Sequence, residues 1–298
     1  MNKLLLTLLI FNASCLSEQR VENLRTPIPK GGSNQVINTG DSHGFSYVLN
    51  LSEYQKQKIA EQIFKNETGG SRAKLVHWNV GEEFPSLGIA HFIWIRSDQK
   101  LAFSDSFKGL IEFYISGGYR LPKFLNDLSP SFERPWRTSS EFWSQRNSSE
   151  VMELEKFLAF TFNVQASYVF EKMKNSLPKI FNGLSDRNKD LVDYNIKKVI
   201  TSSASWYPIV DYINFKGAGT DQIETTASGG WGLRQVLLKM NSKDGDASSA
   251  FAEAAKNILS LRIQKRPQDE RWREGWYKRI DTYKIFDIES DSGSFKPE

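Results

Sequence analysis

The sequence predicts a mostly helical α+β fold with one small β-hairpin. Apolar residues recur at helical spacing in most segments between positions 53 and 283. Only one run, residues 88–94 (Gly-Ile-Ala-His-Phe-Ile-Trp), is short, β-branched and aromatic enough to predict a strand or half of a hairpin. The 298 residues are 39% hydrophobic, which is enough apolar material for one sizeable core or two small ones.

The chain begins with the pattern of a secretory signal peptide. A charged start at Met1–Lys3 precedes an apolar run at Leu4–Phe11, so residues 1–15 are excluded from the fold. Cys15, the only cysteine, stands where a bacterial lipoprotein carries its acylated residue, after the small residues that such sites require. Asn12 departs from the usual Leu, and an ordinary signal peptide that contains a cysteine is the alternative. We expect an envelope lipoprotein, anchored through Cys15 and facing the periplasm or the cell surface.

Composition divides the rest of the chain into three parts. Residues 16–45 are rich in Ser, Asn, Gly and Pro, which predicts a flexible tether. Residues 46–285 hold the periodic segments and form the expected domain. Residues 286–298 read as a frayed acidic tail.

The stretch from Ser52 to Trp94 organises the domain. Ser52 and Gln55 form a capping-box pair, so a helix is expected over residues 53–66, ended by Gly69 and Gly70. Glu67 then lies in the last turn, beside the apolar hairpin. Apolar neighbours disfavour a carboxylate, so we expect the pKa of Glu67 to be raised.

Further helices are expected along the chain. Their predicted ranges are 105–116, 121–128 (short), 149–174 (one long helix), 186–203, 206–212 (a helix or a turn), 231–240, 246–266 (opened by Ser248 and Ser249) and 270–283. Residues 129–137 contain two prolines and are expected to form a loop.

Glu67-Thr68 after a helix, followed by Ser86-Leu-Gly-Ile-Ala-His91, resembles the lysozyme-like superfamily. In phage-type lysozymes a catalytic Glu ends a helix and a Gly-Ile-Gly-His hairpin follows; here Ala90 replaces the second Gly. The resemblance covers about 30 residues and implies a lysozyme-like fold with an enlarged helical lobe.

A longer resemblance, over most of residues 50–283, is to a set of uncharacterised secreted bacterial proteins. They carry Trp-Asn-x-Gly-Glu-x-Phe-x-Ser-Leu-Gly-Ile-Gly-His-Phe-Ile-Trp, which corresponds to residues 78–94. Their second motif, Asp-Tyr-x-Asn-Phe-Lys-Gly-x-Gly-Thr, corresponds to residues 211–220.

Two carboxylates are the catalytic candidates. Glycoside cleavage commonly uses a pair of carboxyl groups. The resemblance makes Glu67 the expected general acid and Glu82, at the fixed Glu of the motif, the second carboxylate. Glu83 is a weaker candidate, and the alternative for each is a solvent-exposed side chain with no role.

Polar and aromatic residues of the two motifs are the candidates for substrate binding, because sugar rings combine apolar faces with polar rims. They are Ser86, His91, Trp206, Asp211, Tyr212, Asn214, Lys216 and Gln235. The alternative is packing of these side chains in the core. Gly232-Leu-Arg-Gln235 resembles the Gly-Leu-Met-Gln motif of lytic transglycosylases, but Glu224 lies too near it to match their catalytic Glu.

Other classes of function find little support. A net charge of +4 is too small to indicate nucleic-acid binding, and the basic, aromatic segment 271–279 fits either a glycan contact or a solvated helix. His77, His91 and Glu82 lack zinc-site spacing, so no metal or cofactor is expected.

The sequence therefore predicts a secreted enzyme that cleaves peptidoglycan, as a hydrolase or a lytic transglycosylase. Chitin or chitosan is the alternative polymer. The rival function is a non-catalytic envelope lipoprotein that binds glycan in a lysozyme-like cleft.

Overall fold

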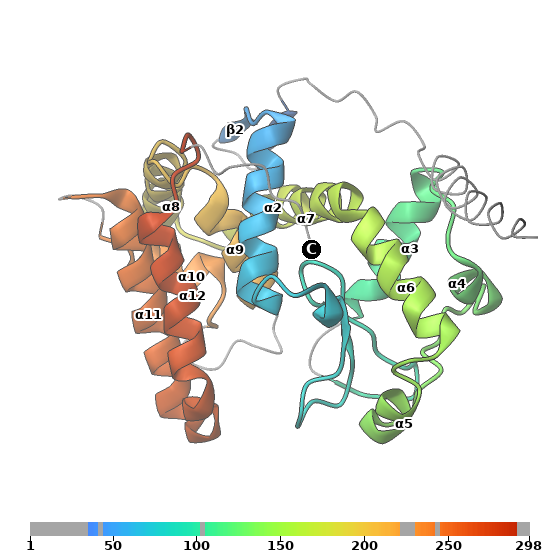
Figure 1. Cartoon of the computed structure of the whole chain (residues 1–298). Helices are drawn as coiled ribbons and strands as arrows, with labels where there is room; N and C mark the ends of the chain where they lie inside the picture. Colours follow the sequence, from blue (N-terminus) through green and yellow to red (C-terminus); the bar gives the residue numbers. More distant parts are fainter. Residues whose placement is uncertain (1–34, 41–43, 102–104, 221–229, 242–244, 291–298) are drawn as a thin grey trace, which may run out of the picture.

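The computed structural model describes residues 35–40, 44–101, 105–220, 230–241 and 245–290. Helix α2 (Glu53–Thr68) stands near the middle (Figure 1). On one side of it lie the small sheet and helices α3 to α6; on the other lie helices α8 to α12 (Figure 1). Helix α7 (Phe162–Ser176) packs against both α2 and α9. The predicted class, mostly helical with a small antiparallel sheet, is confirmed.

Helix α2 forms as its ends predict. The Ser52 side chain accepts a hydrogen bond from the Gln55 amide, and the Gln55 side chain accepts one from the Ser52 amide, which completes the capping box. Gly69 adopts the left-handed conformation (φ 68°) at the other end, and Glu67 lies in the last turn.

The small sheet has three short antiparallel strands: β3 (Val76–His77), β4 (Ser86–Leu87) and β5 (Phe92–Ile93). The run 88–94, expected as a strand or half of a hairpin, is the turn and second strand of the β4–β5 hairpin. Its strand part is short because Gly88 (φ 71°) and His91 (φ 49°) take left-handed backbone angles that end a strand. Gln165 of α7 holds this turn by accepting a hydrogen bond from the Ile89 amide at 3.0 Å.

The long helix expected over residues 149–174 is two helices, α6 (Ser149–Phe160) and α7. Thr161 lies between them. Its hydroxyl donates to the Phe157 carbonyl and lies 2.6 Å from the Tyr114 hydroxyl. A side chain that hydrogen-bonds the preceding turn competes with the helical ladder, and this gives the break a local cause.

The remaining helices follow the predicted ranges closely. They are α3 (Ser106–Ser116), α4 (Lys123–Asp127), α5 (Ser139–Ser144, not predicted), α8 (Asp186–Ile200), α9 (Tyr207–Lys216), α10 (Leu233–Lys239), α11 (Ala247–Lys265) and α12 (Arg273–Ile285), with 3₁₀ turns at Arg72–Lys74, Leu177–Phe181 and Pro267–Trp272. Helix α11 is capped by Asp246 rather than by Ser248 or Ser249.

The domain extends further at both ends than expected. Strands β1 (Gln35–Asn38) and β2 (Ser46–Leu49) pair antiparallel and bury Ile37 and Tyr47, so residues 35–40 are folded rather than a tether. Residues 286–290 are also held, since the Lys58 ammonium binds the Asp287 carbonyl at 2.7 Å and Phe286 is buried.

Residues 1–34, with Cys15 and most of the expected tether, and residues 291–298 lie outside the described residues. Within the described ones, the apolar side chains of both sides of α2 join one core. No helix in this part of the chain combines the length and apolar character needed to cross a membrane.

Candidate active site

Glu67 lies where four elements meet. Its Oε1 atom accepts a hydrogen bond from Arg279 Nη1 of α12 at 2.6 Å and one from Asn214 Nδ2 of α9 at 3.4 Å. Its Oε2 atom lies 3.2 Å from Nδ1 of His91 in the β4–β5 turn. The carboxylate is 13% exposed, so it faces solvent only narrowly.

Arg279 links Glu67 to a second buried carboxylate. Its Nε and Nη2 atoms each lie 2.8 Å from an oxygen of Asp211, in the two-point geometry typical of a strong guanidinium–carboxylate pair. Tyr283 also donates a hydrogen bond to Asp211 at 2.5 Å, and Asn66 of α2 donates a longer one at 3.4 Å. One guanidinium therefore serves two carboxylates.

The electrostatic environment of Glu67 is the opposite of the one expected. Burial raises the pKa of this carboxyl group, but Arg279 and then His91 lower it, and together they bring the pKa well below its usual range. The expected raised pKa is therefore wrong. Arg279 is 212 residues from Glu67 in the chain, so the residues around Glu67 do not indicate its presence.

Glu82 has the environment that was expected for Glu67. It lies in the turn between β3 and β4, where its carboxylate accepts a hydrogen bond from Asn79 Nδ2 at 3.1 Å. Burial raises the pKa of Glu82, and the negative charge of Glu67 acts in the same direction. Glu83, by contrast, has an exposed side chain.

His91 presents a polar atom that nothing satisfies. Its Nε2 atom is buried and forms no hydrogen bond with the described residues. A buried polar atom without a partner is costly, and such atoms need an explanation. Ser86, in β4, is 3% exposed and pairs with His77 and Ile93 in the sheet, so its predicted contact with substrate is wrong in this conformation.

The second group of predicted binding residues is mostly buried. Trp206 (3% exposed), Asp211 (0%) and Tyr212 (0%) cannot contact a polymer in this conformation, so assigning them to substrate contact is wrong. Trp206 and Tyr212 pack in the core. Tyr212 also donates a hydrogen bond to the Trp231 carbonyl at 3.0 Å.

The other members of this group are partly exposed. Asn214 joins the site, because its Nδ2 also donates to the Ala90 carbonyl at 3.2 Å. Lys216 lies between the rings of Phe215 and Trp276, 3.9 Å from each centroid. Gln235 accepts a hydrogen bond from the Gly232 amide and donates to the Gly219 carbonyl, so it fixes a loop. Glu224 lies outside the described residues.

Sequence reasoning missed three residues that complete the site: Arg279, Tyr283 and Asn66. Arg279 was placed in the basic segment 271–279, which was expected either to contact glycan or to form a solvated helix. A signal was present, since Trp276, Arg279 and Tyr283 lie on one face of a helix and two of them are aromatic.

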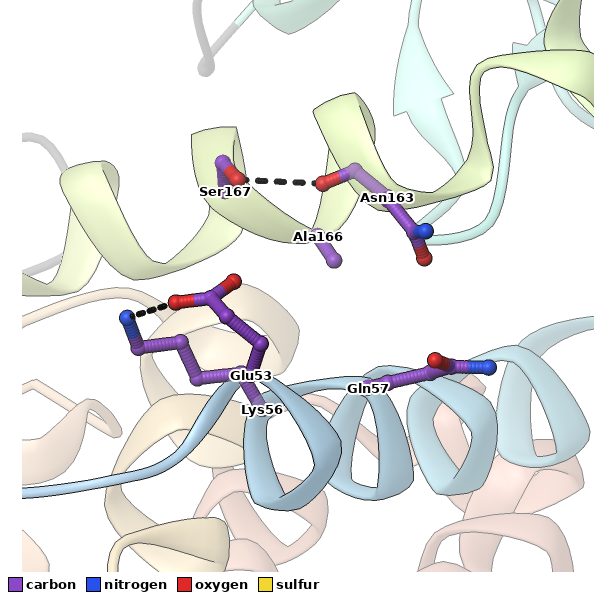
Figure 2. Close-up of a pocket in the computed structure, with 6 residues that line it drawn as sticks. All are labelled: Glu53, Lys56, Gln57, Asn163, Ala166 and Ser167. Carbon is purple, nitrogen blue, oxygen red and sulfur yellow. Dashed lines mark hydrogen bonds and ion pairs between the residues drawn. The ribbon is translucent and has the colours of Figure 1, made fainter. Parts of the chain in front are cut away.

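Two hollows in the described surface lie elsewhere. One lies between α2 and α7, lined by the residues in Figure 2, and encloses about 90 Å³, which is below the roughly 300–1,000 Å³ of typical ligand pockets. The other lies between α2 and α12, beside Lys58. No three His, Cys, Asp or Glu side chains within the described ranges are grouped to hold a metal ion.

Comparison with known proteins gives no relative: no family model, no curated protein and no solved structure matches this chain. Its function must therefore be argued from the site itself.

Proposed function

We propose that the chain is an enzyme that cleaves peptidoglycan, with Glu82 as the proton donor and Glu67 as the ionised carboxylate. The proposal is carried by the contrast between the two carboxyl groups. Arg279 and His91 hold Glu67 at 2.6 and 3.2 Å and lower its pKa. The Glu82 carboxylate, in the β3–β4 turn, has only Asn79 as its hydrogen-bond partner among the described residues, and burial raises its pKa. Such a pair assigns its own acid and base roles. The lysozyme-like resemblance around Glu67 and His91 adds independent support for a glycan as substrate.

The roles are exchanged relative to the sequence-based expectation. A carboxyl group whose pKa is raised keeps its proton nearer neutral pH, which suits Glu82 to protonate a leaving oxygen. A carboxylate held by Arg279 and His91 stays charged, which suits Glu67 to stabilise positive charge on the sugar ring or to activate a nucleophile.

A second candidate function is binding without catalysis. One observation favours it: both oxygens of Glu67 are already engaged, by Arg279 and Asn214 on one side and His91 on the other. A carboxylate that must act on substrate loses one of these contacts first. A glycan-binding envelope lipoprotein would need no such change.

Digestion of purified peptidoglycan separates these functions. We expect Glu82→Gln to lower the rate about 100- to 10,000-fold, the range of general acid catalysis, and Glu67→Gln to lower it by a comparable factor. Glu83→Gln, one residue along the same turn, is the matched control and should keep full activity. Released reducing ends indicate hydrolysis, and anhydro ends indicate transglycosylation.

Two results would contradict the proposal. Full activity of Glu82→Gln would remove it as the acid. Wild-type protein that binds peptidoglycan and releases no fragments would favour the binding function.

The envelope location is a further proposal, which rests on the pattern of residues 1–15. The mature protein should carry lipid on Cys15 and partition into detergent, and Cys15→Ala should stay in the aqueous phase. Mass spectrometry of the mature N-terminus without an acyl group would overturn it.

A further inference from the structure

Lys172 places an ammonium group beside the candidate active site with nothing to neutralise it directly. The side chain extends from α7 over Phe92, the residue that follows His91, with Nζ 5.8 Å from the ring centroid. The same Nζ lies 6.0 Å from the centroid of Tyr168. Within the described ranges, no carboxylate, hydroxyl or carbonyl group forms an ion pair or hydrogen bond with it.

Lys172 is half-buried, and because a lysine charge is strongly hydrated, partial burial without a counter-charge is unfavourable. The two aromatic rings compensate only weakly, since cation–π contacts near 6 Å lie at the limit of the interaction. Glu67 is the nearby negative charge, and it raises the pKa of Lys172; burial nevertheless lowers that pKa overall. No ion pair joins Lys172 to Glu67, whose oxygens are engaged by Arg279, Asn214 and His91.

The other basic groups near the site differ from Lys172. Arg279 is shared between Glu67 and Asp211. Lys174, two residues along the same helix, pairs with Glu171 at 2.7 Å. Within the described part of the chain, Lys172 is therefore a cation near the site that has no counter-charge bound to it.

We propose that Lys172 binds a carboxylate of the glycan substrate and so selects polymers whose sugars carry a carboxyl group over neutral ones. This rests on the proposed function and narrows its substrate class, since peptidoglycan carries free carboxylates on its peptide stems and, where a stem is missing, on the lactyl group, whereas chitin carries none. The bound carboxylate lies against α7 and β5, next to His91, while the sugar ring reaches Glu67 and Glu82.

A purely structural role for Lys172 predicts something different. Glu67, Asp211 and Arg279 together carry one net negative charge, and Lys172 balances it at a distance. Removing a balancing charge changes the cluster, and so affects every ligand equally. Removing a carboxylate-binding group affects only ligands with a carboxylate.

The test uses two tetrasaccharides that differ in this feature. One alternates N-acetylglucosamine with N-acetylmuramic acid and carries no peptide; the other contains N-acetylglucosamine only. Binding is measured by calorimetry in the Glu82→Gln background, so that neither sugar is consumed. Lys172→Met, which keeps most of the apolar stem, should weaken binding of the first about 10- to 100-fold and leave the second unchanged. Lys174→Met is the matched control and should change neither.

A second measurement does not depend on a variant that folds. Nuclear magnetic resonance of the Lys172 side chain should show its pKa rise when the muramic-acid tetrasaccharide binds and stay constant with the neutral one.

Three outcomes overturn the inference: equal weakening for both sugars, no weakening for either, or no binding of the muramic-acid sugar by the parent protein. Its failure is distinguishable from that of the enzyme proposal. Selective binding without cleavage in the wild type keeps the Lys172 assignment and removes the catalytic one. Cleavage that is unaffected by Lys172→Met does the reverse.

Discussion

The two sides of the candidate site are built in different ways. Helices α9 and α12 contribute a closed network of charges, in which Asp211, Arg279 and Tyr283 satisfy one another. The turns between β3, β4 and β5 contribute less fully bonded groups: the Nε2 atom of His91 has no partner among the described residues, and burial raises the pKa of Glu82. The difference indicates that the helical side sets the geometry and that the hairpin side is available for chemistry. Glu67 belongs to both.

The strongest way to break this comparison is to open the charge network. Arg279→Leu leaves Asp211 and Glu67 buried without their cation, so we expect the free energy of unfolding to fall by about 3–5 kcal/mol. Urea unfolding followed by circular dichroism measures it. Arg273→Leu, on the same helix, removes a surface pair with Glu270 and a hydrogen bond to Tyr277, and should cost less than about 1 kcal/mol. Equal losses would show that the network contributes no more than a surface pair.

A smaller effect is expected at the residue that the two sides share. At pH 7, Glu67→Gln should lower the free energy of unfolding by about 1.5–3 kcal/mol, because it weakens hydrogen bonds to a charged group. The folded-state pKa of Glu67 lies below the unfolded value of 4.5, so its stabilisation is fully present above about pH 4.5 and declines as the pH falls below it. The difference between wild type and Glu67→Gln should therefore shrink in acid.

This result has a clear control and a clear contradiction. Glu53→Gln, at the exposed start of the same helix, should give a small difference at every pH. If Glu67→Gln is as stable as wild type at neutral pH, the prediction is wrong. That result would support the sequence-based expectation, in which an apolar environment makes this carboxylate destabilising.

The smallest effect is expected from Gln165→Ala, which tests the hairpin side of the comparison. Gln165 is fully buried, accepts from the Ile89 amide at 3.0 Å and donates to the Leu158 carbonyl at 2.6 Å. Gln165→Ala leaves both backbone groups unsatisfied, at a cost of about 1–3 kcal/mol. Hydrogen exchange should then show faster local opening of residues 86–93, with α9 and α12 still protected. Ser167→Ala, exposed on the same helix, should not change that exchange.

The sequence predicts the parts of this molecule whose causes are local. The capping box at Ser52 and the glycine at 69 lie within a turn of the helix ends that they determine, so helix α2 and the position of Glu67 were predictable. The start of helix α3 next to Asp105 was predictable for the same reason. The loop over residues 129–137 was predictable from its two prolines. The break at Thr161 was not, because an apolar pattern reads through one polar residue.

The electrostatic environment of the site could not be predicted from the sequence, because its contacts are long-range. The pKa of Glu67 depends on Arg279, and the burial of Asp211 depends on Tyr283, 72 residues away. A sequence read locally shows an acidic residue beside apolar ones and predicts a raised pKa. Only the folded structure shows that Arg279 lies against Glu67. Glu82, whose hydrogen-bond partner Asn79 is three residues away, lies in the turn between β3 and β4, and its catalytic role stays a prediction.

The pairing of Glu67 with Arg279 also determines when the site can form during synthesis and folding. The two residues are 212 positions apart, and α12 is the last described helix. During synthesis Glu67 and the hairpin are made early, but the carboxylate has no counter-charge until almost the whole domain has been made. A chain interrupted before Arg279 would hold two buried carboxylates with no cation between them, and it should not reach this fold. The site can therefore assemble only after α12, which carries Arg279, has been synthesised.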